Sequence, residues 1–190
     1  MHKHYNKMES EKLIQLLIEQ TKEIINQVEN LKNDDLKTLT WKENKTSWSV
    51  LECLEHLNLY GDFYLPEIDR KIKNSNTKKE TEFKNGFLGN YFAKSMLPKE
   101  NLNKMKTFKD KNPLNANLDK SVIDKFINQQ VKLLDLLDQS RSVSLNKVRI
   151  ETSISSLIKL RLGNTFQFFI NHNIRHIKQI DRIQNEIKNA

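Results

Sequence analysis

The chain has 190 residues, enough for one domain with a substantial hydrophobic core, and we expect residues 1–190 to form a single domain. It contains only 4 Gly and 3 Pro, a composition that favours long helices and an all-α fold. Its single cysteine, Cys53, excludes an intrachain disulfide. The N-terminus lacks the apolar core of a signal peptide, and no apolar run approaches the roughly 20 residues of a membrane span. We therefore expect a cytoplasmic protein that does not contact membranes.

The net charge of +8 is unevenly distributed along the chain. Residues 1–80 contain 13 Lys and Arg against 14 Asp and Glu, whereas residues 81–190 contain 19 against 10. The basic residues of the second half alternate with acidic and apolar ones, without a Lys/Arg block, an aromatic platform or a zinc-finger spacing. This distribution predicts a solvated basic surface and no specific nucleic-acid site.

The first two helices are predicted over residues 10–31 and from Ser49 to about residue 68. In the first, apolar residues recur at three- and four-residue steps, and Ser10 is placed to be its N-cap. In the second, Ser49 and Glu52 have the spacing of a capping box. Helical periodicity places Ser49, Glu52, Cys53, His56, Tyr60 and Phe63 on one face of the second helix, whereas Glu55, Asn58, Asp62 and Asp69 point elsewhere.

The rest of the chain predicts a long connection and two further helices. Residues 73–118 are rich in Lys, Asn, Thr and Pro and can include a short helix in GFLGNYFAKSML; a crossover of this length suits two neighbouring parallel helices. A third helix over residues 119–140 turns Val122, Phe126, Leu133, Leu136 and Leu137 inward. Residues 142–162 mix β-branched residues with serines, and we interpret them as an ordered loop with one helical turn. The last helix begins near residues 163–164 and continues to about residue 187.

His172 and His176 lie on one face of this last helix, together with Thr165, Phe168, Phe169, Gln179, Ile180 and Ile183. Asn171, Arg175, Lys178 and Arg182 lie on the opposite face. Histidines four residues apart on a helix have Cβ atoms about 5–6 Å apart and can bind one metal ion. Two core histidines hydrogen-bonded to their neighbours would give the same spacing. His56 favours the metal interpretation, because it too faces inward and three buried imidazoles without an ion would each need a partner.

The stretches KTSWSVLECLEHLN, LGNYF and HNIRHIKQI resemble the DinB-like superfamily, whose members are also called YfiT-like metal-dependent hydrolases. The resemblance extends over nearly the whole chain. It implies a four-helix bundle of up-down-down-up topology, with a long crossover between the second and third helices. It also implies a divalent metal, usually zinc or nickel, held by His56, His172 and His176. Because members of the family are often dimers, it further implies a homodimer.

The ligand set implied by this resemblance suggests a function. Three neutral imidazoles leave a divalent ion with an open coordination position, which is typical of a catalytic site and activates water or a thiol at neutral pH. Characterised relatives include S-transferases that use low-molecular-weight thiols such as bacillithiol or mycothiol, and a thiol-dependent maleylpyruvate isomerase. The resemblance thus implies a thiol S-transferase or detoxifying enzyme that acts on a small-molecule substrate with a thiol cosubstrate. The alternatives are a metal-dependent hydrolase and a non-catalytic, metal-containing bundle for binding or stress sensing.

Three residues near His56 are further catalytic candidates. Glu52 would orient an imidazole or act as a base, although its place in the capping box explains it equally. For Cys53, the alternatives are a fourth metal ligand, a reactive thiol and a buried packing residue. For Tyr60, they are a residue that binds substrate and an aromatic core residue. Elsewhere, Gln179 suits a supporting role beside His176 or a packing role, and Arg175 is expected at the surface or in an interface. His2 and His4 are expected in a frayed terminus, where they can at most form an adventitious metal site.

Overall fold

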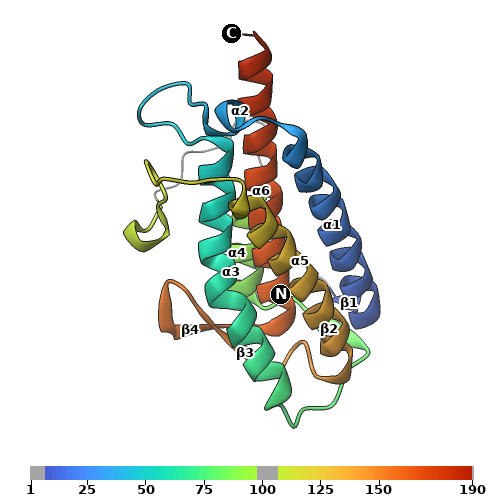
Figure 1. Ribbon diagram of the computed structural model, residues 1–190. Coiled ribbons are helices and arrows are strands. Elements are labelled where there is room, and N and C mark those ends of the chain that lie inside the picture. The colour runs from blue at the N-terminus through green and yellow to red at the C-terminus, as the bar shows by residue number, and fades with distance from the viewer. Residues whose placement is uncertain (1–6, 98–106, 190) are drawn as a thin grey trace.

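Four long helices make up most of the protein in the computed structural model, which describes residues 7–97 and 107–189. These helices are α1 (Ser10–Asn30), α3 (Val50–Lys73), α5 (Ser121–Gln139) and α6 (Leu162–Asn189). In Figure 1, α1 and α6 run from the lower to the upper end of the molecule, whereas α3 and α5 run the opposite way. The predicted helical character is therefore confirmed, and the predictions for His2 and His4 lie outside the described residues.

The long helices enclose one hydrophobic core. Helices α1 and α3 each pack against both α5 and α6. Side chains from all four helices meet in the centre without solvent exposure, among them Val28, Leu54, Phe126 and Phe169. The five inward residues predicted for the third helix are all buried on α5. Because this burial fixes the position of α3 against α6, it also fixes the place where their side chains meet.

Short helices and 3₁₀ turns occupy the connections. Helix α4 (Phe87–Ser95) confirms the short helix predicted within the long crossover. The remaining short elements are α2 (Leu36–Thr40) and the 3₁₀ turns η1 (Leu31–Asn33), η2 (Lys109–Lys111) and η3 (Ser140–Ser142). None of the described helices is long and apolar enough to cross a membrane.

Two small antiparallel two-stranded sheets depart from the all-α prediction. Strand β1 (Lys7–Glu9) pairs with β2 (Glu82–Lys84), and β3 (Arg149–Thr152) pairs with β4 (Ser155–Arg161). The interpretation of residues 142–162 as a loop with a helical turn is therefore wrong for most of that range. The β-branched residues that blurred the helical pattern there belong to a β-ladder, in which Ile150 pairs with Leu160 and both are buried.

The starts of the long helices follow from local chemistry, with two corrections. Ser49 caps α3 in the predicted capping box with Glu52. Ser10, by contrast, is the first helical residue of α1 and not its N-cap, because the preceding residues form β1 and the Ser10 amide donates to the Thr81 carbonyl instead (2.8 Å). Asn58, predicted to point away from the core, is fully buried and donates to the Val122 carbonyl of α5 (3.1 Å).

A glycine sets the start of α6. A Cβ atom at Gly163 would lie 2.5 Å from the ring of Phe83, a fully buried residue of β2. No other residue type therefore fits here without displacing β2. The close approach positions the first turn of α6, and with it the helical face that carries the two histidines.

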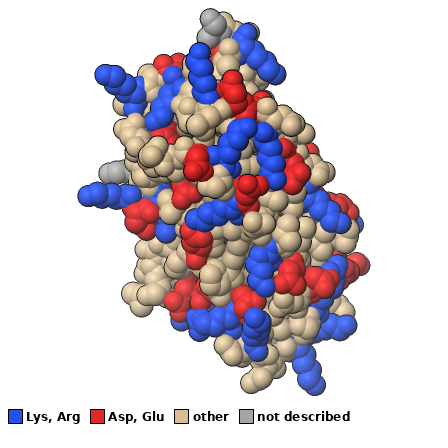
Figure 2. Space-filling view, viewed as in Figure 1, with Lys and Arg blue, Asp and Glu red and all other residues tan. Residues whose placement is uncertain are grey.

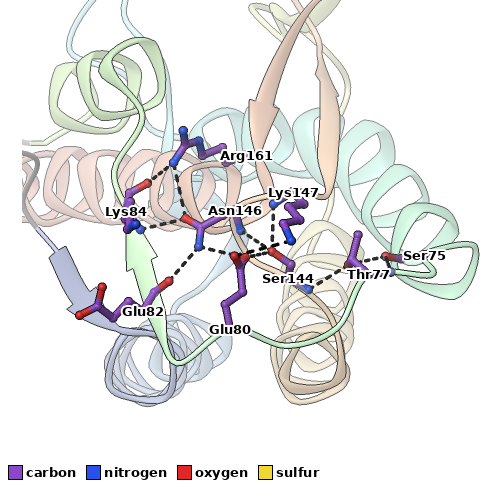
Figure 3. A network of polar contacts seen from close by, with 9 residues as sticks. All are labelled: Ser75, Thr77, Glu80, Glu82, Lys84, Ser144, Asn146, Lys147 and Arg161. Carbon is purple, nitrogen blue, oxygen red and sulfur yellow. Dashed lines mark hydrogen bonds and ion pairs between the residues drawn. The ribbon is translucent and has the colours of Figure 1, made fainter.

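A polar network ties the segment after α3 to the loop before β3 (Figure 3). Glu80 accepts hydrogen bonds from the Ser144 hydroxyl and from Asn146 Nδ2. The side-chain oxygen of Asn146, Oδ1, accepts from the Lys84 amide at 2.9 Å. Arg161 of β4 donates to the Lys84 carbonyl at 2.6 Å. The network thus joins β2 and β4 at one end of the bundle. On the face shown in Figure 2, basic and acidic side chains are interspersed.

Candidate metal centre

Three buried histidines from two helices converge on one point. His56 comes from the second turn of α3, and His172 and His176 come from α6. The Nε2 atom of His172 lies 3.2 Å from Nε2 of His56 and 3.1 Å from Nε2 of His176. Their exposed fractions are only 3%, 5% and 8% in chain order. The helical spacing of His172 and His176 and the inward orientation of His56 are therefore as predicted.

Hydrogen bonds to carbonyl oxygens fix the tautomers of two of these rings. His56 Nδ1 lies 2.6 Å from the Lys111 carbonyl, and His176 Nδ1 lies 3.0 Å from Gln179 Oε1. Because a carbonyl oxygen only accepts, each Nδ1 carries the proton and donates it. The Nε2 atoms of His56 and His176 therefore each turn a lone pair towards the centre of the cluster.

The donor set fits a divalent metal ion. The only proton available between the three rings is one on His172 Nε2, and a single N–H cannot satisfy two lone pairs well. A cation at this point is bound by all three nitrogens at once, with the outer hydrogen bonds orienting the rings as in known histidine metal sites. His172 Nδ1 is buried and has no hydrogen-bond partner among the described residues.

Burial also keeps the three rings in the form that binds metals. It lowers the pKa of His56 to about 4 and the pKa of His176 to about 3, and it lowers the pKa of His172 well below its usual value. In each ring the loss of hydration disfavours the charged imidazolium. All three side chains are thus neutral near pH 7, as metal coordination requires.

Aromatic rings surround the histidines. The Trp48 ring centroid lies 4.7 Å from that of His56 and 5.8 Å from that of His176, and the Trp48 indole donates to Asn112 Oδ1 (3.2 Å). Tyr60 lies edge-on to His56 and His172, with centroid distances of 5.0 and 4.7 Å. Phe168 stacks on His172 from the preceding turn of α6, at 6.2 Å. These rings exclude water, which strengthens electrostatic interactions inside the site.

Glu52 lies in the capping box, and none of its hydrogen bonds to described residues involves His56, His172 or His176. One carboxylate oxygen accepts from the Ser49 amide (2.8 Å), and the other accepts from Lys42 Nζ (2.6 Å) and from the Asn115 amide (2.5 Å). Three donors therefore occupy this buried carboxylate. Its position supports the capping interpretation and ties the segment around Asn115 to the start of α3.

Cys53 is enclosed in the hydrophobic core with no exposed surface. Burial, with a further contribution from the Glu52 carboxylate, raises the pKa of its thiol far above the ordinary value. A thiol in this state is protonated at neutral pH and unreactive. The structure thus places Cys53 as a packing residue, outside the group of three histidines.

The surface position predicted for Arg175 is wrong, and the sequence did not reveal the Lys111 carbonyl. Arg175 is only 8% exposed and therefore buried. One turn earlier on α6, Asn171 donates to the Ala93 carbonyl of α4 (2.9 Å). The Lys111 carbonyl is a backbone group from a turn distant in sequence, so no pattern of side chains predicts its contact with His56. Gln179 has the supporting role that its spacing predicts, because it accepts from His176.

A comparison with protein families agrees with this geometry. The sequence model of the DinB superfamily matches residues 35–180, a range that contains α3, α5 and all three histidines. Searches of curated proteins and of solved structures gave no match. Because the matched range covers well over half of the sequence, the chain belongs to the DinB superfamily.

Proposed function

We propose that this protein is a divalent-metal-dependent enzyme that acts on a small molecule, and that its activity is thiol S-transfer. The observation that carries the proposal is the convergence of three Nε2 atoms, two of them with lone pairs fixed inward by the Lys111 carbonyl and Gln179. A divalent ion, zinc or nickel, supplies Lewis acidity there and lowers the pKa of a thiol or water at its open position.

The residues of the chain hold the ion and shape its surroundings. His56, His172 and His176 bind it as neutral ligands, and Trp48 and Phe168 exclude bulk water from two sides. Among the described residues, no carboxylate belongs to the histidine group, so a divalent ion held there would keep its full double positive charge and would attract an anionic ligand. This charge favours a thiol that binds as its thiolate.

The state of Cys53 supports an external nucleophile. Its thiol is buried in the core and held in the protonated form, so it does not serve as the attacking group. A low-molecular-weight thiol as cosubstrate supplies the missing nucleophile and attacks an electrophilic small molecule. We also propose that the four long helices form the up-down-down-up bundle of the superfamily, which their directions in Figure 1 support.

A conjugation assay tests this function. The metal-loaded protein is mixed with a low-molecular-weight thiol and 1-chloro-2,4-dinitrobenzene near pH 7, and we expect formation of the thioether faster than without protein. Chelation should remove the acceleration, and zinc or nickel should restore it. Cleavage of an ester or amide without thiol would instead indicate a hydrolase. If the protein binds the ion but accelerates neither reaction, it is a non-catalytic bundle.

A further inference from the structure

The Tyr60 side chain lies beside two of the three histidines of the cluster. It follows His56 by one turn of α3, and its ring contacts both His56 and His172 edge-on. Among the described residues its hydroxyl makes no hydrogen bond, although the side chain is only 8% exposed.

Tyr64 shows that the free hydroxyl of Tyr60 is not a general feature of this helix. Tyr64 lies one turn further along α3, and its ring stacks on that of Tyr60 with centroids 6.4 Å apart. Its hydroxyl contacts the Ser153 hydroxyl (3.3 Å) and accepts from the Ser153 amide (3.2 Å). The two tyrosines thus differ in the hydrogen bonding of their hydroxyl groups. The Tyr64 hydroxyl is bonded to Ser153, whereas the Tyr60 hydroxyl has no partner among the described residues and can bind a ligand.

One charge of each sign lies near the cluster, because Lys111 acts on His56 and Asp110 acts on Tyr60. A preference for an anionic ligand therefore comes from the double positive charge of the proposed ion. Lys111 is mostly buried, its side chain 16% exposed, and its ammonium lies close enough to His56 to lower the pKa of that ring further. The acid nearest to this ammonium, Asp110, is 3.4 Å away and largely exposed. The Tyr60 phenol is protonated at neutral pH, so its hydroxyl can donate a hydrogen bond.

We propose that the Tyr60 hydroxyl donates a hydrogen bond to a small anion bound at the open side of the three-histidine metal site. The proposal rests on the proposed metal site and adds the group that selects its ligand. An acceptor with a negative charge, such as a thiolate or carboxylate, gains a charge-assisted hydrogen bond from the phenol. A neutral ligand without an acceptor gains nothing from it.

Azide binding to the cobalt-loaded protein tests the proposal without requiring any enzymatic activity. Cobalt(II) replaces the resident ion, and its visible absorption reports both metal occupancy and the entry of azide. We expect Tyr60→Phe to bind cobalt with unchanged stoichiometry and to bind azide about tenfold more weakly than the wild type, since a hydrogen bond to a charged group is lost. Tyr64→Phe is the matched control and should bind azide as the wild type does.

The outcomes separate this inference from the proposed function. If cobalt binds but Tyr60→Phe retains azide affinity within twofold, or Tyr64→Phe loses as much, the role of Tyr60 is wrong and the metal site stands. If the wild type does not bind cobalt stoichiometrically, both the metal site and the role of Tyr60 are wrong. In the thiol assay, Tyr60→Phe should raise the KM for the thiol more than it lowers kcat.

Discussion

The Nε2 atoms of His56 and His172 lie 3.2 Å apart, although the two residues are separated by 116 positions in the sequence. Their side chains come from α3 and α6, which pack against each other in the bundle. His176 completes the cluster from the next turn of α6. The packing of two helices thus brings together ligands that local sequence supplies only in part, and the following predictions test what the cluster does.

Removing any one of the three histidines should abolish stoichiometric metal binding. His56→Ala, His172→Ala and His176→Ala each leave two ligands and an open cavity, which lowers affinity severely. Elemental analysis of the purified variants, compared with about one ion per chain in the wild type, measures the effect. A variant with both His2 and His4 replaced by Ala is the control. If that double variant loses the ion and the three single variants keep it, the assignment is wrong.

Gln179→Ala should weaken metal affinity about 10- to 100-fold without abolishing binding. Gln179 Oε1 accepts the Nδ1 proton of His176, and its loss frees the ring to rotate and to change tautomer. A competition titration with a chromophoric chelator measures the affinity. Gln184→Ala is a matched control, because Gln184 also lies on α6 but donates to Asp34 (3.1 Å). Equal losses in both variants would indicate a general effect on α6 instead of support for His176.

Cys53→Ala should retain both the metal and the turnover. The thiol is enclosed in the core, so its removal leaves a small cavity and costs about 1 kcal/mol of unfolding free energy. In the wild type, a disulfide reagent such as Ellman's should not label the thiol of the native protein. It should label this thiol once denaturant is added. Loss of turnover in Cys53→Ala with the metal still bound would make the protein's own thiol the nucleophile and contradict the proposed mechanism.

Glu52→Gln should reduce stability and leave the turnover per bound metal ion unchanged. The substitution removes the charge that pairs with Lys42 and weakens the hydrogen bonds from the Ser49 and Asn115 amides, at a cost of about 1–3 kcal/mol. Urea unfolding followed by circular dichroism measures the cost. The opposite pattern, normal stability with lost turnover, would identify Glu52 as a catalytic base.

The sequence predicts the site better than it predicts the chain between the helices. The capping box of Ser49 and Glu52 and the four-residue spacing of His172 and His176 are local patterns, so they are readable without tertiary information. The β3–β4 hairpin is not, because its short strands are stabilised by cross-strand pairs such as Ile150 and Leu160 more than by intrinsic preference.

The burial of Arg175 and Asn58 shows the same limit. Periodicity turns each side chain away from the core, yet both are buried, and Asn58 donates to the Val122 carbonyl of α5. Which helix packs on which face is decided by the whole fold. For the same reason the Lys111 carbonyl, which orients His56, had no signal in the sequence.

That carbonyl makes the turn around η2 a thermodynamic partner of the metal site. Three hydrogen bonds attach the turn to the start of α3: His56 donates to the Lys111 carbonyl, the Trp48 indole donates to Asn112 Oδ1, and the Asn115 amide donates to Glu52. When the turn detaches, His56 loses its fixed tautomer, and the Nε2 lone pair of His56 is no longer held towards the other two histidines. An ion bound to the histidines must therefore stabilise the attached turn by the same free energy with which the attached turn increases the affinity for the ion.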